Sequence, residues 1–175
     1  PDRESRKRAS DAAEVDSVET KVKLAEECER KGMWSEAVKL YRQAAQSNYA
    51  DDPDILGRLA RAQLGSGEAD AALATLDDIR SADPGYKNQD AHLTYARALE
   101  AQGRLEEAEE EYRDLARYYV GMEARARYAL LLQRQGETDG ARQLYEQVVK
   151  ASNARGIVLS REDWEWVKVA KKALV

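Results

Sequence analysis

The sequence contains one cysteine, one histidine, three prolines and no phenylalanine among its 175 residues. The single cysteine, Cys28, excludes an internal disulfide framework and a cysteine-based zinc site. The single histidine, His92, excludes a metal site built from paired histidines. Few prolines, together with abundant Ala, Leu, Glu, Arg and Gln, argue against an all-β fold and favour long helices.

The sequence also lacks an excess of basic residues. It contains 28 Lys and Arg against 33 Asp and Glu, so the formal net charge is −5. This balance argues against wrapping of nucleic acid, although a local basic strip remains compatible with it. No apolar run approaches the roughly 18 residues of a membrane-spanning helix, and no signal peptide is present. The sequence starts at Pro1 without Met, so we expect that a membrane or targeting segment, if there is one, preceded this position.

Residues 1–15 form a basic N-terminal segment with almost no apolar side chains to bury. Its cations are Arg3, Arg6, Lys7 and Arg8. We predict a flexible, solvated segment or the frayed start of the first helix. The alternative is a juxtamembrane segment that rests on anionic lipid. Helical periodicity begins near Asp16, whose spacing to Glu19 fits a capping box.

Residues 16–150 repeat a helix–turn–helix pattern four times. The glycines of the predicted turns are Gly32, Gly67, Gly103 and Gly136, which lie 35, 36 and 33 residues apart. The alanines Ala37, Ala72, Ala108 and Ala141 repeat the same intervals. We therefore predict four units at about 18–52, 53–88, 89–121 and 122–150, with each glycine just past a helix end in the left-handed conformation.

Small and large side chains alternate in the same register. Where the first helix of each unit crosses the second, the small residues Ala25, Ala60, Ala96 and Ala129 allow close approach. Larger residues fill the space toward the next unit: Tyr41, Leu76, Tyr112 and Tyr145. Residues 151–175 lack the period, so we predict a connector interrupted at Gly156 and a final capping helix that opens at Ser160.

These residues resemble the tetratricopeptide-repeat (TPR) family over about residues 18–150. The unit length, the small residue in the first helix, the turn glycine, the alanine of the second helix and the following aromatic all match. The resemblance implies an all-α, right-handed solenoid of four repeats plus a C-terminal capping helix. The family's aromatic near the start of the first helix is replaced by Lys21, Leu56, His92 and Arg125, and its closing proline is clear only at Pro84.

Residues 49–63 carry a narrower resemblance, to bacterial TPR proteins that begin with a short hydrophobic membrane hairpin. That group implies repeats that lie in the cytoplasm, tethered to the inner membrane through a segment absent from this sequence. The basic cluster at Arg3–Arg8 fits such an origin.

Motifs for catalysis are absent from the sequence. It contains no glycine-rich phosphate loop, nucleophile elbow or metal-binding histidine motif. Cys28 falls on the buried face of a predicted helix, and the acidic run at 106–111 is typical of a solvated helix face. We therefore expect no enzyme activity, cofactor, metal or small-molecule substrate.

Protein binding is the function that the resemblance favours, because the first helices of TPR units line a concave groove. The groove candidates are Lys23, Arg58, Arg61, Thr94, Arg97, Arg127, Leu130 and Arg134. The arginines suggest an acidic peptide or a free C-terminus as the guest. The alternative is that they are ordinary solvated positions paired with nearby Glu and Asp. The family's clamp for a C-terminal carboxylate needs asparagines that this sequence lacks.

Two other functions are alternatives to partner binding. The end helices of two copies can pack together in a homo-oligomer, and one of Trp164 and Trp166 is expected to be partly exposed at such a surface. An RNA-binding helical repeat is disfavoured by the net charge and by the lack of aromatics among the groove candidates.

Overall fold

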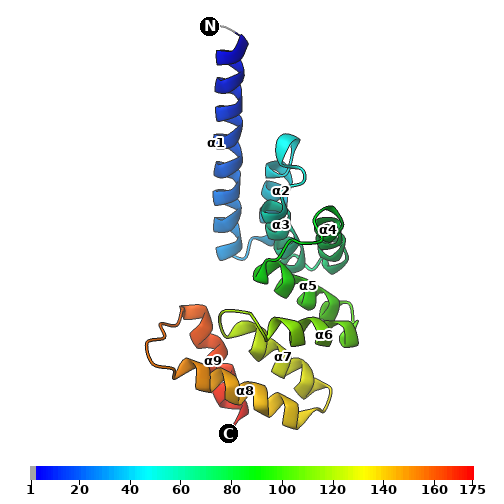
Figure 1. Cartoon of the computed structure of the whole chain (residues 1–175), viewed down its shortest axis with the longest axis vertical. Coiled ribbons are helices and arrows are strands. Elements are labelled where there is room, and N and C mark those ends of the chain that lie inside the picture. The colour runs from blue at the N-terminus through cyan, green and yellow to red at the C-terminus, as the bar shows by residue number, and fades with distance from the viewer. Residues whose placement is uncertain (1–2) are drawn as a thin grey trace. The chain divides into compact units, whose positions relative to one another are not determined.

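The computed structural model describes residues 3–175, apart from the side chains of Ser5, Ala9, Val15 and Ser47. All regular secondary structure in this part of the chain is helical (Figure 1). The elements are α1 (Arg3–Arg30), α2 (Trp34–Ala44), the 3₁₀ helix η1 (Ser47–Tyr49), α3 (Pro53–Gly65), α4 (Ala69–Ala82), α5 (Gln89–Ala101), α6 (Leu105–Leu115), α7 (Glu123–Arg134), α8 (Thr138–Ser152) and α9 (Arg161–Ala173). The predicted all-α class is confirmed.

The chain divides into two compact units, Pro1–Gln102 and Gly103–Val175, called unit 1 and unit 2 below. In unit 1, α1 packs on α2, α2 on α3 and α3 on α4, while α5 packs on both α3 and α4. In unit 2, α6 packs on α7, α7 on α8, and α9 on both α7 and α8. The third predicted repeat supplies α5 to unit 1 and α6 to unit 2. The exact limits predicted for the repeats stay a prediction.

The turn glycines have the predicted left-handed backbone. Gly32, Gly67, Gly103 and Gly136 have φ between +70° and +84°. A Cβ atom at any of these four positions would meet no other atom within 4 Å. Glycine is therefore needed there for its backbone conformation and not for space.

The core follows the predicted alternation of small and large side chains. The crossing alanines Ala25, Ala60, Ala96 and Ala129 are completely buried. Tyr41 and Tyr112 are also completely buried, and Leu76 and Tyr145 are nearly so. Cys28 is half-buried and packs against the cluster around Tyr41 in unit 1. The small residues thus let helices approach while the large ones fill the space toward the next helix.

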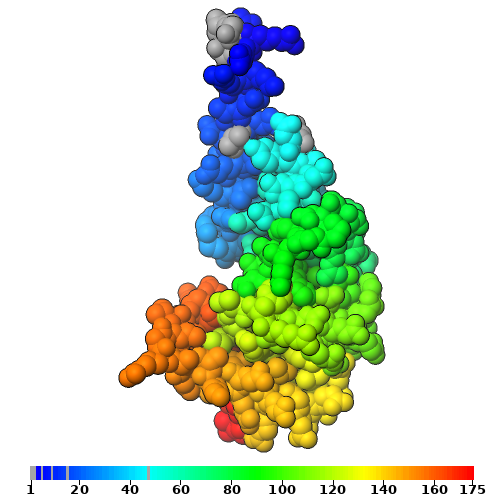
Figure 2. Space-filling view, in the orientation of Figure 1, coloured from blue at the N-terminus to red at the C-terminus, as the bar shows by residue number. Residues whose placement is uncertain are grey.

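The first helix begins earlier than the sequence predicts. Helix α1 starts at Arg3, so the expected capping box at Asp16 is wrong. No glycine or proline lies between Arg3 and Asp16, and Arg, Ala, Glu and Lys are good helix formers. The first turns of α1 are exposed and stand clear of the rest of unit 1 (Figure 2). The expected flexibility of segment 1–15 stays a prediction, and its residues 1 and 2 lie outside the described part.

The last helix, α9, begins directly after Ser160, as the sequence predicts, and lies at the C-terminal end of unit 2. Gly156, with φ of +82°, lies in the connector that follows α8. The Ser160 hydroxyl caps α9 by accepting a hydrogen bond of 3.0 Å from the Asp163 backbone N–H. Val167 and Ala170 are fully buried against the preceding helices. The exposed side of α9 carries an ion pair of 2.8 Å between Glu165 and Lys168, and Trp164 is 47% exposed. Helix α9 therefore closes this end of the repeats with a solvated face.

Candidate partner-binding surface

The first helices of the repeats in unit 1 present one common surface. Positions nine and six residues before each turn glycine are three apart, so they lie on one face of a helix. In α1 they are Lys23 and Glu26, and in α3 they are Arg58 and Arg61. In α5 they are Thr94 and Arg97. We call this face of α1, α3 and α5 the A-helix surface.

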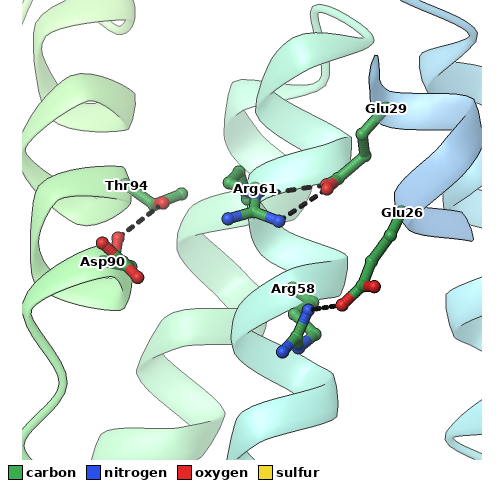
Figure 3. A network of polar contacts seen from close by, with 6 residues as sticks. All are labelled: Glu26, Glu29, Arg58, Arg61, Asp90 and Thr94. Atoms are coloured by element: carbon green, nitrogen blue, oxygen red, sulfur yellow. Dashed lines mark hydrogen bonds and ion pairs between the residues drawn. The ribbon is translucent and has the colours of Figure 1, made fainter. Parts of the chain in front are cut away.

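Two ion pairs join α3 to α1 across this surface (Figure 3). Arg58 donates to Glu26. Arg61 holds Glu29 with both arms of its guanidinium, Nε to Oε1 at 3.2 Å and Nη2 to Oε2 at 2.5 Å. The Glu29 side chain is only 10% exposed, and that of Arg61 is 36% exposed. Two of the arginines that were expected to meet an acidic guest are therefore already paired with carboxylates of the chain itself.

Electrostatics reinforce the second pair. Burial alone would lower the pKa of Arg61, but the hydrogen bond and the charge of Glu29 outweigh it and raise the pKa. Asp90, on the other side of Arg61, adds to the same effect. Arg61 thus stays charged and lies between two carboxylates, and Glu29 holds it in position.

Tyr41, completely buried, lies against this network. Its hydroxyl is the one buried side-chain polar atom in the described part of the chain that has no hydrogen-bond partner. Burial raises the pKa of Tyr41 to about 12, and the charge of Glu29 acts in the same direction. The charge of Arg61 opposes the shift, and so does Arg58, whose guanidinium lies near the hydroxyl but outside hydrogen-bond geometry. The buried hydroxyl without a hydrogen-bond partner therefore lowers the free energy of unfolding, whereas the packing of the aromatic ring raises it.

A polar pocket of about 250 Å³ opens between α3 and α5. Gly57, which has no side chain, and Ala91, which has only a methyl group, are among its lining residues. The polar side chains that line it are Asp54, Arg58, Arg61, Tyr86, Asn88, Asp90 and Thr94. All of them belong to unit 1, so the pocket is a feature of that unit alone.

Local hydrogen bonds fix the walls of the pocket. The Tyr86 hydroxyl donates to Asp54 at 2.7 Å, and the Asn88 side-chain oxygen caps α5 by accepting from the backbone N–H groups of Asp90 and Ala91, both at 3.0 Å. The Thr94 hydroxyl donates to the backbone carbonyl of Asp90 at 2.8 Å. The pKa of Tyr86 is raised, first by burial and then by its bond to Asp54. The walls are thus set before any guest arrives.

The predicted groove residues are only partly brought together. Arg58, Arg61 and Thr94 share the pocket, whereas Lys23 and Arg97 of unit 1 do not line it. Lys23 pairs with Glu19 on its own helix at 2.7 Å. The remaining candidates lie on α7 in unit 2, so the five arginines among the groove candidates are divided between two units.

In unit 2, the groove candidate Arg127 makes an ion pair and a cation–π contact. It pairs with Glu123 at 2.7 Å, and its guanidinium lies 4.6 Å from the centre of the Trp166 ring. Leu130 is half-buried and Arg134 is exposed. Trp166 is half-buried in this contact and Trp164 is 47% exposed, as expected for one of the two tryptophans. The terminal helix thus contacts one of the predicted groove arginines.

Sequence reasoning missed Asp54, Tyr86, Asn88 and Asp90. Tyr86 and Asn88 stand in the connector before α5, outside the repeated helical pattern. A signal for Asn88 was present, because asparagine just before a helix is a preferred cap. The charge pairs also had a signal, since Arg58 and Glu26 and likewise Arg61 and Glu29 are 32 residues apart, about one repeat less one helical turn.

Within residues 3–175, no group of three or more His, Cys, Asp and Glu side chains is placed to hold a metal ion. None of the described helices is both long and apolar enough to cross a membrane.

Comparisons with known proteins identify the repeat. Two family models described as tetratricopeptide repeat match residues 30–87 and 93–155. The comparison with curated proteins found no match.

Solved structures share the fold at low sequence identity. A putative kinesin light chain from Podospora anserina with nearly identical TPR-like repeats is 22% identical, with a TM-score of 0.65 over 89% of this chain and 85% of that one. A MamA protein is 15% identical, with a TM-score of 0.61 over 90% and 82% of the two chains. A thermophilic TPR protein from Thermus thermophilus is 19% identical, with a TM-score of 0.51 over 90% and 98%. At these identities the likeness shows the fold alone. The two family models, which together match more than half of the chain, show that the chain belongs to the tetratricopeptide repeat family.

Proposed function

We propose that the chain is a non-catalytic interaction module that holds a segment of a partner protein against the A-helix surface of unit 1. Tetratricopeptide repeats generally mediate protein–protein interaction, and proteins built from them are typically scaffolds without catalysis. The observation that carries the proposal is the polar pocket between α3 and α5, which lies on that surface.

The pocket suits a segment of polypeptide better than a free small molecule. It is polar and small, and its walls offer both donors, in Arg58 and Arg61, and acceptors, in Asp54 and Asp90. Single side chains of a bound segment can enter such a pocket while the segment's backbone runs along the helices. Lys23 on α1 and Arg97 on α5 do not line the pocket, but they belong to the A-helix surface and extend the proposed contact area.

Ala91→Gln tests this proposal, because the longer side chain fills the pocket without breaking an ion pair. Purified chain is used to capture partners from the source lysate, followed by mass spectrometry. We expect the variant to lose the partners that the wild type captures, with an unchanged circular dichroism spectrum. Ala74→Gln is the matched control, since Ala74 is exposed on α4 and does not line the pocket. Equal capture by Ala91→Gln and wild type would contradict the assignment.

Self-assembly through the α1 end is a second candidate that one observation favours. The residues eight positions before the turn glycine are largely covered in the later repeats: Leu59 and Tyr128 are 7% and 8% exposed, and Tyr95 is half-buried. Leu59 packs in the cluster that contains Ala25 of α1, and Tyr128 stacks on Tyr112 of α6. Leu24, the corresponding residue of α1, is 53% exposed. The exposed side of α9 carries the ion pair between Glu165 and Lys168 beside Trp164, which is 47% exposed.

Sedimentation velocity of the wild type and of Leu24→Glu decides on this candidate. The candidate predicts a dimer at micromolar concentration that Leu24→Glu turns into a monomer. A wild-type chain that sediments as a monomer would exclude it and leave the partner-binding proposal in place.

A further inference from the structure

We propose that the pocket between α3 and α5 takes a basic side chain, lysine or arginine, of the bound segment. This inference rests on the function proposed above and reverses the acidic guest that the arginines alone suggest.

The charge balance of the pocket is negative once the internal pairs are considered. Arg58 and Arg61 are matched by Glu26 and Glu29 on α1. Asp54 and Asp90 then remain as the acidic groups of the pocket walls. The lining itself holds two carboxylates and two guanidinium groups, and the two guanidinium groups are in addition paired with Glu26 and Glu29 on α1, outside the lining. Lys87 stands in the same connector as Tyr86 but does not line the pocket.

Acceptor capacity is left on both aspartates. The Asp54 carboxylate accepts one hydrogen bond, from Tyr86, whereas a carboxylate offers about four acceptor sites. The Asp90 carboxylate, in the part of the chain that the structure describes, takes part in no side-chain hydrogen bond or ion pair and senses Arg61 only through its charge. Ammonium and guanidinium groups are donors only, so they match this set of acceptors.

An acidic side chain meets the opposite situation. Through the edge formed by Nε and Nη2, Arg61 could bind it only by releasing Glu29, whose side chain is 10% exposed. Through the other edge of the guanidinium, the guest carboxylate would meet the charge of Asp90, which already acts on Arg61. A buried carboxylate left without its partner is strongly destabilised. The guest carboxylate would also lie between Asp54 and Asp90. The raised pKa of Tyr86, caused by burial and then by Asp54, agrees with a negative potential at this wall.

Size also fits a single long side chain. The pocket volume of about 250 Å³ exceeds the roughly 30 Å³ share of one water molecule several times over. It does not accommodate a folded element. The apolar stem of a lysine or arginine can lie along Gly57 and Ala91 while its charged end reaches the aspartates.

The test uses blocked single amino acids as probes and the whole ¹⁵N-labelled chain as the target. N-acetyl-lysine methylamide, N-acetyl-arginine methylamide and N-acetyl-glutamate methylamide are titrated separately while the amide resonances are followed. We expect saturable shifts at Gly57, Ala91 and Thr94 with the two basic probes, with dissociation constants on the order of 1–10 mM. The acidic probe should give no saturable shift there.

Asp54→Asn combined with Asp90→Asn should weaken binding of the basic probes about tenfold or more. Asp77→Asn combined with Asp78→Asn changes the net charge equally on exposed residues of α4 and should leave binding unchanged. Saturation with the acidic probe, no saturation with either basic probe, or equal loss in both double variants would overturn the inference.

Failure of this inference can be told apart from failure of the proposed function. If the basic probes do not bind but Ala91→Gln still loses its partners, only the charge class is wrong. If the probes bind as expected but Ala91→Gln captures as the wild type does, the pocket exists without the proposed role in partner binding.

Discussion

At the scale of single residues, two glycines of α3 show how one substitution can have opposite effects. A Cβ atom at Gly65 would lie 2.4 Å from a ring atom of Trp34, the first residue of α2. A Cβ atom at Gly57 would lie 3.6 Å from the Cβ of Ala91, which is ordinary contact. Neither glycine is among those with positive φ. Space, and not backbone conformation, therefore decides the outcome at both positions.

Gly65→Ala should destabilise the chain by about 1–3 kcal/mol, because the indole of Trp34 must move out of its packed position. Gly57→Ala should stabilise it by about 0.5–1 kcal/mol through the helix preference of alanine. Urea unfolding followed by circular dichroism measures both. Equal effects of the same sign would contradict the packing of Trp34 on α3.

Tyr41 provides a second test at this scale and makes stability depend on pH. Its pKa in the folded chain, about 12, lies above its ordinary value of 10.0. The folded state therefore holds the proton more tightly, so this contribution to stability is complete below pH 10 and is lost as pH rises toward 12.

Tyr41→Phe removes a buried hydroxyl that has no partner, so we expect a gain of about 1 kcal/mol near pH 8. The loss of stability between pH 10 and 11 should also be smaller in the variant than in the wild type. Urea unfolding at pH 8, 10 and 11 checks this, with Tyr49→Phe in η1 as the control. A destabilised Tyr41→Phe chain would mean that the hydroxyl makes a favourable bond.

Much at the residue scale was predictable. The turn glycines and the crossing alanines follow from regular spacing, because each is required by local backbone geometry or by close helix approach. The partner of Trp34 was not predictable, since its contact with Gly65 depends on how two neighbouring hairpins pack.

At the scale of elements, α1 differs from all other helices in the described chain. It is 28 residues long, whereas the others have 15 or fewer. Its second half packs on α2, while the side chains of its first turns are exposed. Periodicity identified only the packed half, because the exposed half has no apolar stripe that a pattern could reveal. The helix-forming residues before Asp16 allow α1 to begin at Arg3, ahead of the predicted start.

Hydrogen exchange followed by mass spectrometry should separate the two halves of α1. Amides before about residue 17 should exchange within seconds, since an isolated helical stretch of this length is marginal in water. Amides from Ala25 to Arg30 should exchange at the slower rate of α3. Strong protection throughout α1 would show that the first half is covered, for example by a second copy.

At the scale of the whole molecule, the family and the fold were predictable because the period recurs four times. The composition of the binding surface was less so. The sequence pointed to Arg58, Arg61 and Thr94, which the structure brings to one pocket, but it treated the arginines as open charges. Their pairing with Glu26 and Glu29 depends on the offset between successive first helices, which is a property of packing.

The central claim is that a partner segment binds to the A-helix surface of unit 1. Site-specific photo-crosslinking in the source lysate tests it most directly, with a photoreactive amino acid placed at Lys23, at Asp54 or, as control, at Asp77 on α4. We predict that the same partner forms adducts from positions 23 and 54 and none from position 77. Adducts from position 77 alone, or equally from all three positions, would contradict the claim.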